Sequence, residues 1–465
     1  MWSAVARYRC QSGGRLPLSK GQLGIRHWLV VISPLFLAGL VVGLGTRGLL
    51  VLVGLLAAVG LLVYPEVSLL LFLTAGTFKA EISRLMPDIP DPTVVLAGIV
   101  AAAVLSRLLR TTGSLSKKRE PRSETRDQRP GTAHFVTLAW AYCAFLFIVV
   151  SSALSFTVTD YGRDKALRFA TLTTLATVAP YFLIDTETRL VRFLIAAVAL
   201  GGAMTVLGTV TGEGLAAFGA THIATGRVIG LGLIGAGYFF WGVRRRLRRW
   251  LVWTPLAGVL LFGFLYSGSR GSLISLGATL VVIVLLAFAF QRGRRMVLTG
   301  LAGCAVLAVV VTASRPEAVE VMNRRLNYVA AGPLTTTAGT RVRLAQAAFE
   351  TFGANPLTGA GIGGFDLAWS LSDRPRGQYP HNIFLEVASE LGVIGLASLV
   401  LFILLGFRNA FRAFRVARGE SLRAAVLVIA IASYFLVNAL FSGDLNDNRM
   451  LFAAVGLCVS RLLDE

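Results

Sequence analysis

The sequence is poor in charged residues: Asp, Glu, Lys and Arg make up 15% of its 465 residues, whereas a soluble domain has about 25%. A chain with so little charge and a mean hydropathy of +0.70 is neither a soluble enzyme nor a disordered segment. Cysteine is also scarce, with 4 residues, which excludes a disulfide scaffold. Since 55% of the residues are hydrophobic, the remaining class is a membrane protein with several spans.

Acidic residues are scarce relative to basic ones. The chain has 45 Lys and Arg against 24 Asp and Glu, a formal net charge of +21. In a soluble protein this excess would suggest nucleic acid as a partner. In a membrane protein it indicates instead which loops face the cytoplasm, so we expect membrane lipids and no nucleic acid as partners.

Long apolar runs predict the fold class. They are continuous rather than alternating, which excludes a β-barrel and favours an all-α polytopic bundle of about 12–14 transmembrane helices. The third and last candidates are short enough to be re-entrant or tilted. The fourteen candidate spans are 28–45, 48–64, 66–79, 93–109, 134–155, 166–184, 190–210, 228–243, 250–266, 271–290, 296–313, 381–407, 422–441 and 449–463.

The basic clusters predict the topology. With both termini in the cytoplasm, most of the Lys and Arg residues fall on the cytoplasmic side, as the positive-inside rule requires. The predicted parts are a basic cytoplasmic tail, an N-terminal helical region with a basic linker at 110–133, and a second membrane region with one long outer loop at 314–380. Their boundaries are 1–27, 28–200 and 201–463.

The long outer loop has its own predicted structure. A helix with an apolar side is expected from Thr340, which would be its N-cap. The run NPLTGAGIGGF follows and ends at Phe365, and its glycines indicate a backbone that turns tightly or closely approaches another group. Long loops with structure of their own are usually functional.

Directly after this loop the chain enters a span with polar residues at its outer end. His381 is one of only 4 histidines, at the first turn of a helix that Pro380 and Asn382 help to start. Glu386 and Glu390 lie one turn apart on one face. A carboxylate at that depth is costly unless paired, so we expect Glu390 in an ion pair or a polar cavity.

Three arginines are expected on the same outer face: Arg227 at the end of an outer loop, Arg270 in a turn between two spans, and Arg341 at the start of the loop helix. Singly, each has the position of a boundary arginine that extends toward water. Together with a histidine they indicate a site for a phosphorylated substrate, because guanidinium groups match phosphate oxygens in pairs.

These residues form motifs that resemble a known family. The sequence resembles the bacterial O-antigen ligase and O-antigen polymerase superfamily over about residues 200–460. The motifs, in the family's order, are G-R-x-x-G (Gly226, Arg227, Gly230), S-R-G (Ser269, Arg270, Gly271), G-x-R-x-x-L (Gly339, Arg341, Leu344), N-P-L-x-G-x-G-x-G-x-F (from Asn355 to Phe365) and H-N-x9-G-x-x-G (His381, Asn382, Gly392, Gly395).

The resemblance implies a membrane glycosyltransferase of the GT-C type at the outer face of the bacterial cytoplasmic (inner) membrane. Its donor would be a glycan on undecaprenyl pyrophosphate and its acceptor a sugar hydroxyl of a glycan or lipid-glycan, with no cofactor and no metal. His381 matches the general base. Arg227, Arg270 and Arg341 match residues that hold the pyrophosphate, and Asn382 and Glu390 join them as expected substrate-binding residues.

The chemistry needs no more than these groups. Arginines neutralise the departing pyrophosphate, a histidine removes the acceptor's proton, and direct attack would invert the anomeric centre. The sequence has no cluster with metal-ligand spacing. Tyr379, Trp369 and Phe365 are candidates for stacking on sugar faces, or for anchoring at the membrane interface.

Alternative functions use other features of the same sequence. A transporter or lipid-linked glycan flippase would use a buried Glu390, and a structural scaffold would need none of the motifs. Within the enzyme hypothesis both a ligase, with a separate acceptor, and a polymerase, whose acceptor is the growing glycan, fit the motifs.

Overall fold

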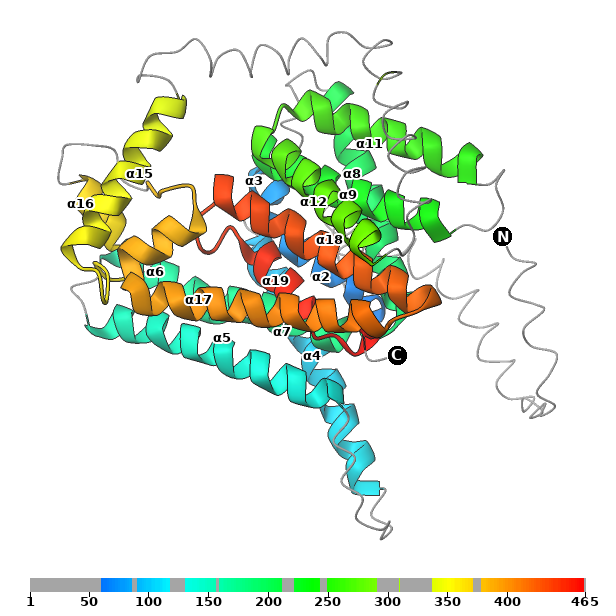
Figure 1. Ribbon diagram of the computed structural model, residues 1–465, viewed down its shortest axis with the longest axis horizontal. Coiled ribbons are helices and arrows are strands. Elements are labelled where there is room, and N and C mark those ends of the chain that lie inside the picture. The colour runs from blue at the N-terminus through cyan, green and yellow to red at the C-terminus, as the bar shows by residue number, and fades with distance from the viewer. Residues whose placement is uncertain are drawn as a thin grey trace, which may run out of the picture. The chain divides into compact units, whose positions relative to one another are not determined.

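The computed structural model describes residues 60–85, 90–117, 130–155, 159–210, 221–242, 249–290, 309, 337–370 and 378–463. All regular structure in these ranges is helical, and eight helices are long and apolar enough to cross a membrane. The prediction of a polytopic all-α membrane protein is thereby confirmed. Residues 64–465 form one unit, to which the labelled helices in Figure 1 belong.

The helices of the first half overlap the predicted spans but several begin earlier. Helix α9 begins at His222, so Arg227 lies within a helix and not at the end of a loop as predicted. Spans 28–45 and most of 48–64 lie outside the described residues. The fourth helix runs to Lys117, so the expected linker begins later than predicted. The elements are α2 (Pro65–Thr74), η2 (Ala75–Thr77), α3 (Lys79–Leu85), α4 (Pro92–Lys117), α5 (Pro130–Ser155), α6 (Asp160–Arg168), η3 (Phe169–Thr173), α7 (Thr174–Leu183), α8 (Glu187–Val210) and α9 (His222–Gly242).

The second half includes one helix, α17, whose regular backbone is interrupted at Gly392. The predicted span 296–313 lies outside the described residues except for residue 309. The longest helix, α17, exceeds its predicted span at the C-terminal end. The elements are η5 (Arg249–Trp253), α11 (Thr254–Ser267), α12 (Arg270–Ala289), α15 (Thr337–Ala354), α16 (Gly364–Ser370), α17 (Ile383–Val416), α18 (Gly419–Phe441), α19 (Arg449–Leu457) and η6 (Arg461–Leu463).

The sixth predicted span begins earlier than its hydropathy indicates. The helical segment starts at Asp160, where the Thr159 hydroxyl accepts a hydrogen bond from the Gly162 N–H (3.2 Å), and continues through the π-helical turn η3 to Leu183. Its first nine residues, DYGRDKALR, are polar, so the apolar pattern begins only after them. Consequently Lys165 belongs to a span and not to a loop.

Close helix contacts and apolar outer faces characterise the bundle. Gly232 in α9 brings its backbone close to α8: a Cβ there would lie 3.2 Å from the Ala197 carbonyl, as is typical of small residues between membrane helices.

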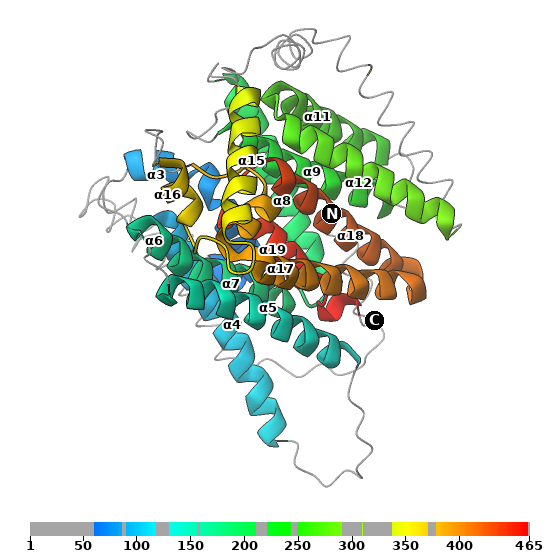
Figure 2. The same cartoon turned by 60° about the vertical axis from the view of Figure 1, so that its left-hand side comes forward.

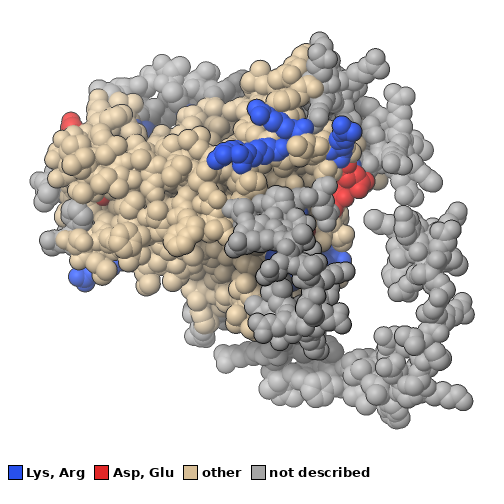
Figure 3. Space-filling model, turned by 60° about the horizontal axis from the view of Figure 1, so that its bottom comes forward, with Lys and Arg blue, Asp and Glu red and all other residues tan. Residues whose placement is uncertain are grey.

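Trp140, Phe147 and Leu285 are among the large apolar side chains that remain exposed. Figure 3 shows neither acidic nor basic residues over most of the described surface on that face, which suits contact with lipid chains.

Polar contacts between helices concentrate at the two ends of the bundle. The site end contains the beginnings of α6, α9, α12 and α17 together with α15 and α16, several of which are visible at the left of Figure 1. The basic end contains ion pairs between neighbouring helices. Loops expected on the same side of the membrane therefore lie at the same end. The pairs at the basic end include Arg107–Asp185 (3.5 Å), Arg192–Glu66 (3.3 Å) and Arg423–Glu187 (3.7 Å).

Candidate active site

His381 lies immediately before the residue that caps α17. The Asn382 Oδ1 accepts hydrogen bonds from the backbone N–H groups of Phe384 (3.0 Å) and Leu385 (3.2 Å), which satisfies donors of the first turn. The predicted helix start is confirmed to within two residues, with His381 outside the first turn. Because the cap occupies the Asn382 oxygen, a substrate contact would fall to its amide NH2 group.

The backbone at His381 adopts a left-handed conformation, with φ of 56°. Residues other than glycine rarely adopt this backbone conformation, which costs on the order of 1–3 kcal/mol. The imidazole ring lies 4.4 Å from the Tyr379 ring between centroids. Its Nδ1 is buried without a hydrogen-bond partner among the described residues. The chain thus holds this imidazole on a costly backbone conformation, with Nδ1 unpaired among the described residues.

Burial and a neighbouring charge keep His381 neutral. Burial of the ring, and secondly the positive charge of Arg341, lower the pKa of His381 from 6.5 to about 4. At neutral pH the imidazole is therefore uncharged and has one nitrogen that can accept a proton. The same dependence shows that Arg341 lies close enough to His381 to act on it.

Arg227 is anchored by the loop between the last two helices. Its Nη2 donates to the Ser442 carbonyl (2.6 Å) and the Asn448 Oδ1 (3.4 Å), and its Nη1 donates to the Asp447 carbonyl (3.5 Å). Its Nε is buried with no partner among the described residues. Three acceptors on one loop therefore set the direction of the guanidinium, while one donor stays available.

The two arginine motifs of α9 and α12 lie against each other. A Cβ at Gly226 would lie 2.6 Å from the Ser269 Cβ, so the residue before Arg227 touches the residue before Arg270. Arg270 is half-buried and opens α12. The first turn of α12 also packs beside the end of α18, because a Cβ at Gly271 would lie 3.1 Å from the Phe441 Cβ.

Helix α15 carries Arg341 and packs on the start of α17. It begins at Thr337, so the predicted cap Thr340 is wrong and lies inside the helix. The predicted apolar side is correct: Leu344 and Ala348 are buried with residues of α16. Figure 2 shows α15 and α16 beside the beginning of α17, and this packing holds Arg341 at the site end.

Two of the three aromatic residues expected to stack on sugars are part of this packing. Phe365 and Trp369 are only 1% and 6% exposed, because they fill the contact between α15 and α17. Tyr379 is half-buried beside His381. Burial and the carboxylates of Asp447 and Asp444 raise the pKa of Tyr379, whereas Arg227 lowers it. Of the three, Tyr379 alone borders the candidate site.

The glycine-rich loop fits against a break in α17. Gly392 has φ of 64° inside the helix, and a Cβ there would lie 2.2 Å from the Leu357 carbonyl oxygen. Gly359, with φ of 70°, would place a Cβ 2.3 Å from the Glu390 carbonyl carbon. The Gly361 N–H donates to the Glu390 carbonyl (2.9 Å). The predicted close approach is confirmed, and its partner is the H-N-x9-G-x-x-G segment itself.

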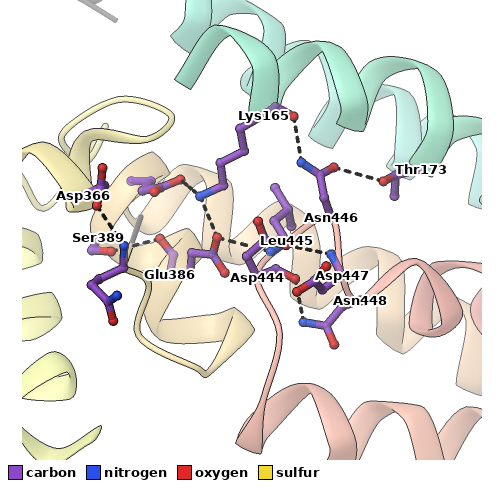
Figure 4. A network of polar contacts seen from close by, with 12 residues as sticks. Lys165, Thr173, Asp366, Glu386, Ser389, Asp444, Leu445, Asn446, Asp447 and Asn448 are labelled. Atoms are coloured by element: carbon purple, nitrogen blue, oxygen red, sulfur yellow. Dashed lines mark hydrogen bonds and ion pairs between the residues drawn. The ribbon is translucent and has the colours of Figure 1, made fainter. Parts of the chain in front are cut away.

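Glu390 belongs to a buried group of three charges. The Lys165 Nζ lies 2.6 Å from the Glu386 Oε1 and 2.6 Å from the Glu390 Oε2, as Figure 4 shows around Lys165. Glu390 is 2% exposed. The ion-pair expectation is confirmed, whereas the expected substrate contact of Glu390 stays a prediction. Lys165 was missed because its segment is too polar to appear as a span.

The loop SGDLNDN (442–448) was also missed. The Leu445 N–H donates to the Glu386 Oε1 (3.2 Å), and the Asn446 Nδ2 donates to the Lys165 carbonyl (3.0 Å). Asp447 is exposed, and its carboxylate lies near enough to Arg227 to stabilise the positive charge of the guanidinium. The signal in the sequence was a polar, amide-rich turn between the last two spans at the outer end.

The site end thus combines a neutral imidazole, guanidinium groups and buried anchoring contacts. Among the described residues, no group of three or more His, Cys, Asp or Glu side chains is placed to hold a metal ion. Guanidinium groups at such a position bind anionic oxygens, and an unprotonated imidazole accepts a proton.

Comparison with known families identifies a matching family over part of the chain. Residues 255–400 match the family model described as O-antigen ligase, and the resemblance drawn from the motifs is confirmed over that range. The matched range includes Arg270, Arg341, the glycine-rich loop and the segment from His381 to Gly395. No match was found among curated proteins.

Proposed function

Because residues 255–400 match the O-antigen ligase family, we propose that the protein transfers or polymerises a glycan from an undecaprenyl-pyrophosphate donor onto a sugar hydroxyl. The site end would face the outer side of the bacterial cytoplasmic membrane. A lipid-linked glycan and a glycan or lipid-glycan acceptor would be its partners.

The observation that carries this proposal is the environment of His381. The Nδ1 of His381, buried with no hydrogen-bond partner among the described residues, lies within the electrostatic reach of Arg341. Tyr379, whose ring contacts His381, is also within reach of the charge of Arg227. A base beside cationic groups suits a reaction in which a hydroxyl loses a proton while a pyrophosphate departs.

In the proposed step, the acceptor hydroxyl oxygen attacks the anomeric carbon of the donor sugar from the side opposite the pyrophosphate. The new carbon–oxygen bond forms as the bond to the pyrophosphate breaks, and the departing oxygen keeps the electron pair. His381 takes the hydroxyl proton. Arg270, Arg341 and the Nε of Arg227 stabilise the charge on the pyrophosphate, with inversion at the anomeric carbon.

The test is transfer by the purified protein in lipid vesicles, with lipid-linked glycan and a candidate acceptor. His381→Ala should lower the rate by about 10²–10⁴-fold, the usual contribution of a general base, while His134→Ala in α5 is the matched control. Arg270→Ala should raise the KM for the donor. Full transfer by His381→Ala would refute the base.

The same assay separates the remaining alternatives. A ladder of products from the lipid-linked glycan alone indicates a polymerase, and a requirement for a second glycan indicates a ligase. Movement of the lipid-linked glycan across the vesicle membrane without transfer would indicate a flippase. We favour the enzyme because Lys165 accounts for the buried Glu390 on which the transporter hypothesis depends.

A further inference from the structure

The buried charges below His381 connect to Arg227 through a continuous set of contacts. Lys165 and Glu386 are each 1% exposed at the side chain, and their ion pair measures 2.6 Å. Lys165 bonds two carboxylates that come from a different helix. In a dry interior such a group persists only where the geometry is well defined, so it forms a fixed point in the fold.

The loop 442–448 is attached to this fixed point on one side. The Glu386 Oε1 accepts from the Leu445 N–H (3.2 Å), and the Lys165 carbonyl accepts from the Asn446 Nδ2 (3.0 Å). The Thr173 hydroxyl donates to the Asn446 Oδ1 (3.3 Å). Figure 4 shows these bonds converging on the loop from two separate helices.

On its other side the loop holds Arg227. The carbonyls of Ser442 and Asp447 and the side chain of Asn448 accept from the guanidinium. Backbone carbonyls cannot move independently of the loop, so the orientation of the guanidinium follows the position of the loop. These three acceptors are neutral oxygens, two of the backbone and one of a side-chain amide.

We propose that Lys165 and Glu386 are positioning residues, which act on the donor pyrophosphate through the loop 442–448 and Arg227. This inference rests on the proposed function. Glu386 is the direct link, since its oxygen contacts both Lys165 and the loop, whereas Glu390 contacts Lys165 and the glycine-rich loop. Removing Glu386 still leaves Lys165 paired with one carboxylate, so the fold is retained.

The decisive experiment is a double-mutant cycle on kcat/KM for the lipid-linked donor. Glu386→Ala should raise the donor KM by about tenfold, the loss of one buried hydrogen bond, with kcat nearly unchanged. Combined with Arg227→Ala, it should add nothing further, because both act on one group. Combined with Arg341→Ala, the two effects should multiply. Glu386→Gln, which keeps an acceptor oxygen, should restore the KM.

The inference would be overturned if the effects of Glu386→Ala and Arg227→Ala on kcat/KM multiplied. It would also be overturned if Glu386→Ala were coupled equally to Arg227→Ala and to Arg341→Ala. A second readout is hydrogen exchange of the amides of 442–448, which should accelerate in Glu386→Ala but not in Arg341→Ala. Unchanged exchange would overturn the positioning role even in a protein without transfer activity. If the wild-type protein transfers no glycan but exchange in 442–448 still accelerates in Glu386→Ala, the proposed function is refuted and the role of Glu386 in positioning the loop is retained.

Discussion

The pKa of His381 leads to a specific prediction for the pH dependence of transfer. Burial and Arg341 lower this pKa to about 4, so the acid limb of kcat/KM should lie near pH 4 instead of near the ordinary value of about 6.5. At pH 6 a histidine with the ordinary pKa is only about one quarter neutral, whereas a pKa of about 4 leaves about 99% neutral. The wild type should therefore lose almost no activity between pH 7 and pH 6.

Replacing Arg341 by Met tests the electrostatic part. The sign follows from the charge: without a nearby cation the protonated imidazole is less disfavoured, so the pKa of His381 rises, while burial keeps it below 6.5. For each unit of rise the acid limb moves up by one pH unit. A rise from 4 to 5 would lower the neutral fraction at pH 5 from about 90% to 50%.

The assay is kcat/KM for the donor between pH 3.5 and 8 in vesicles, with modification of the histidine by diethyl pyrocarbonate as a probe independent of turnover. Arg343→Met is the matched control, because Arg343 lies on the same helix, is exposed and does not act on His381. The reasoning is refuted if the acid limb lies near pH 6.5 in the wild type, or if both arginine variants move it equally.

Three further predictions concern stability. Gly392→Ala should lower the Tm markedly, because its Cβ would lie 2.2 Å from a carbonyl oxygen, whereas Gly277→Ala, with open space around it, should not. Asn382→Ala should lose about 1 kcal/mol from the helix cap, measured by thermal unfolding in detergent, and Asn382→Ser should recover most of it. Lys165→Met should cost about 3–5 kcal/mol by stranding two buried carboxylates; an unchanged Tm would contradict the ion-pair geometry.

The sequence predicted the features that depend on neighbouring residues. The continuous apolar runs located the long helices because membrane helices satisfy their own backbone groups. Asn382 and the segment after it predicted the start of α17, and the glycines around Gly359 predicted a close backbone approach. Each is a local consequence of residue type.

Features that depend on distant partners were not predictable in the same way. Lys165 lies in a polar turn of helix that resembles a loop until its carboxylate partners on α17 are known. Likewise, Phe365 and Trp369 are aromatic residues of the kind that stack on sugars. Only the packing of α15 onto α17 shows that their side chains are buried. Tertiary contacts decided these cases.

The break at Gly392 has a consequence for depth in the bilayer. From Gly392 to Arg408, the first of the exposed arginines at the end of α17, the helix covers at most about 24 Å, less than the ~30 Å hydrocarbon thickness. With Arg408 placed at one headgroup level, the break and the glycine-rich loop against it are expected within the hydrocarbon, where water cannot satisfy backbone groups.

Hydrogen bonds between the glycine-rich loop and the broken part of α17 satisfy these backbone groups, as in a re-entrant loop buried in protein. An unbroken helix from Ile383 to Arg408 would rise about 37 Å, more than the ~30 Å hydrocarbon thickness. We therefore expect His381 near headgroup level. The proposed lipid-linked donor would present its pyrophosphate at this level while its hydrocarbon chain remains in the membrane.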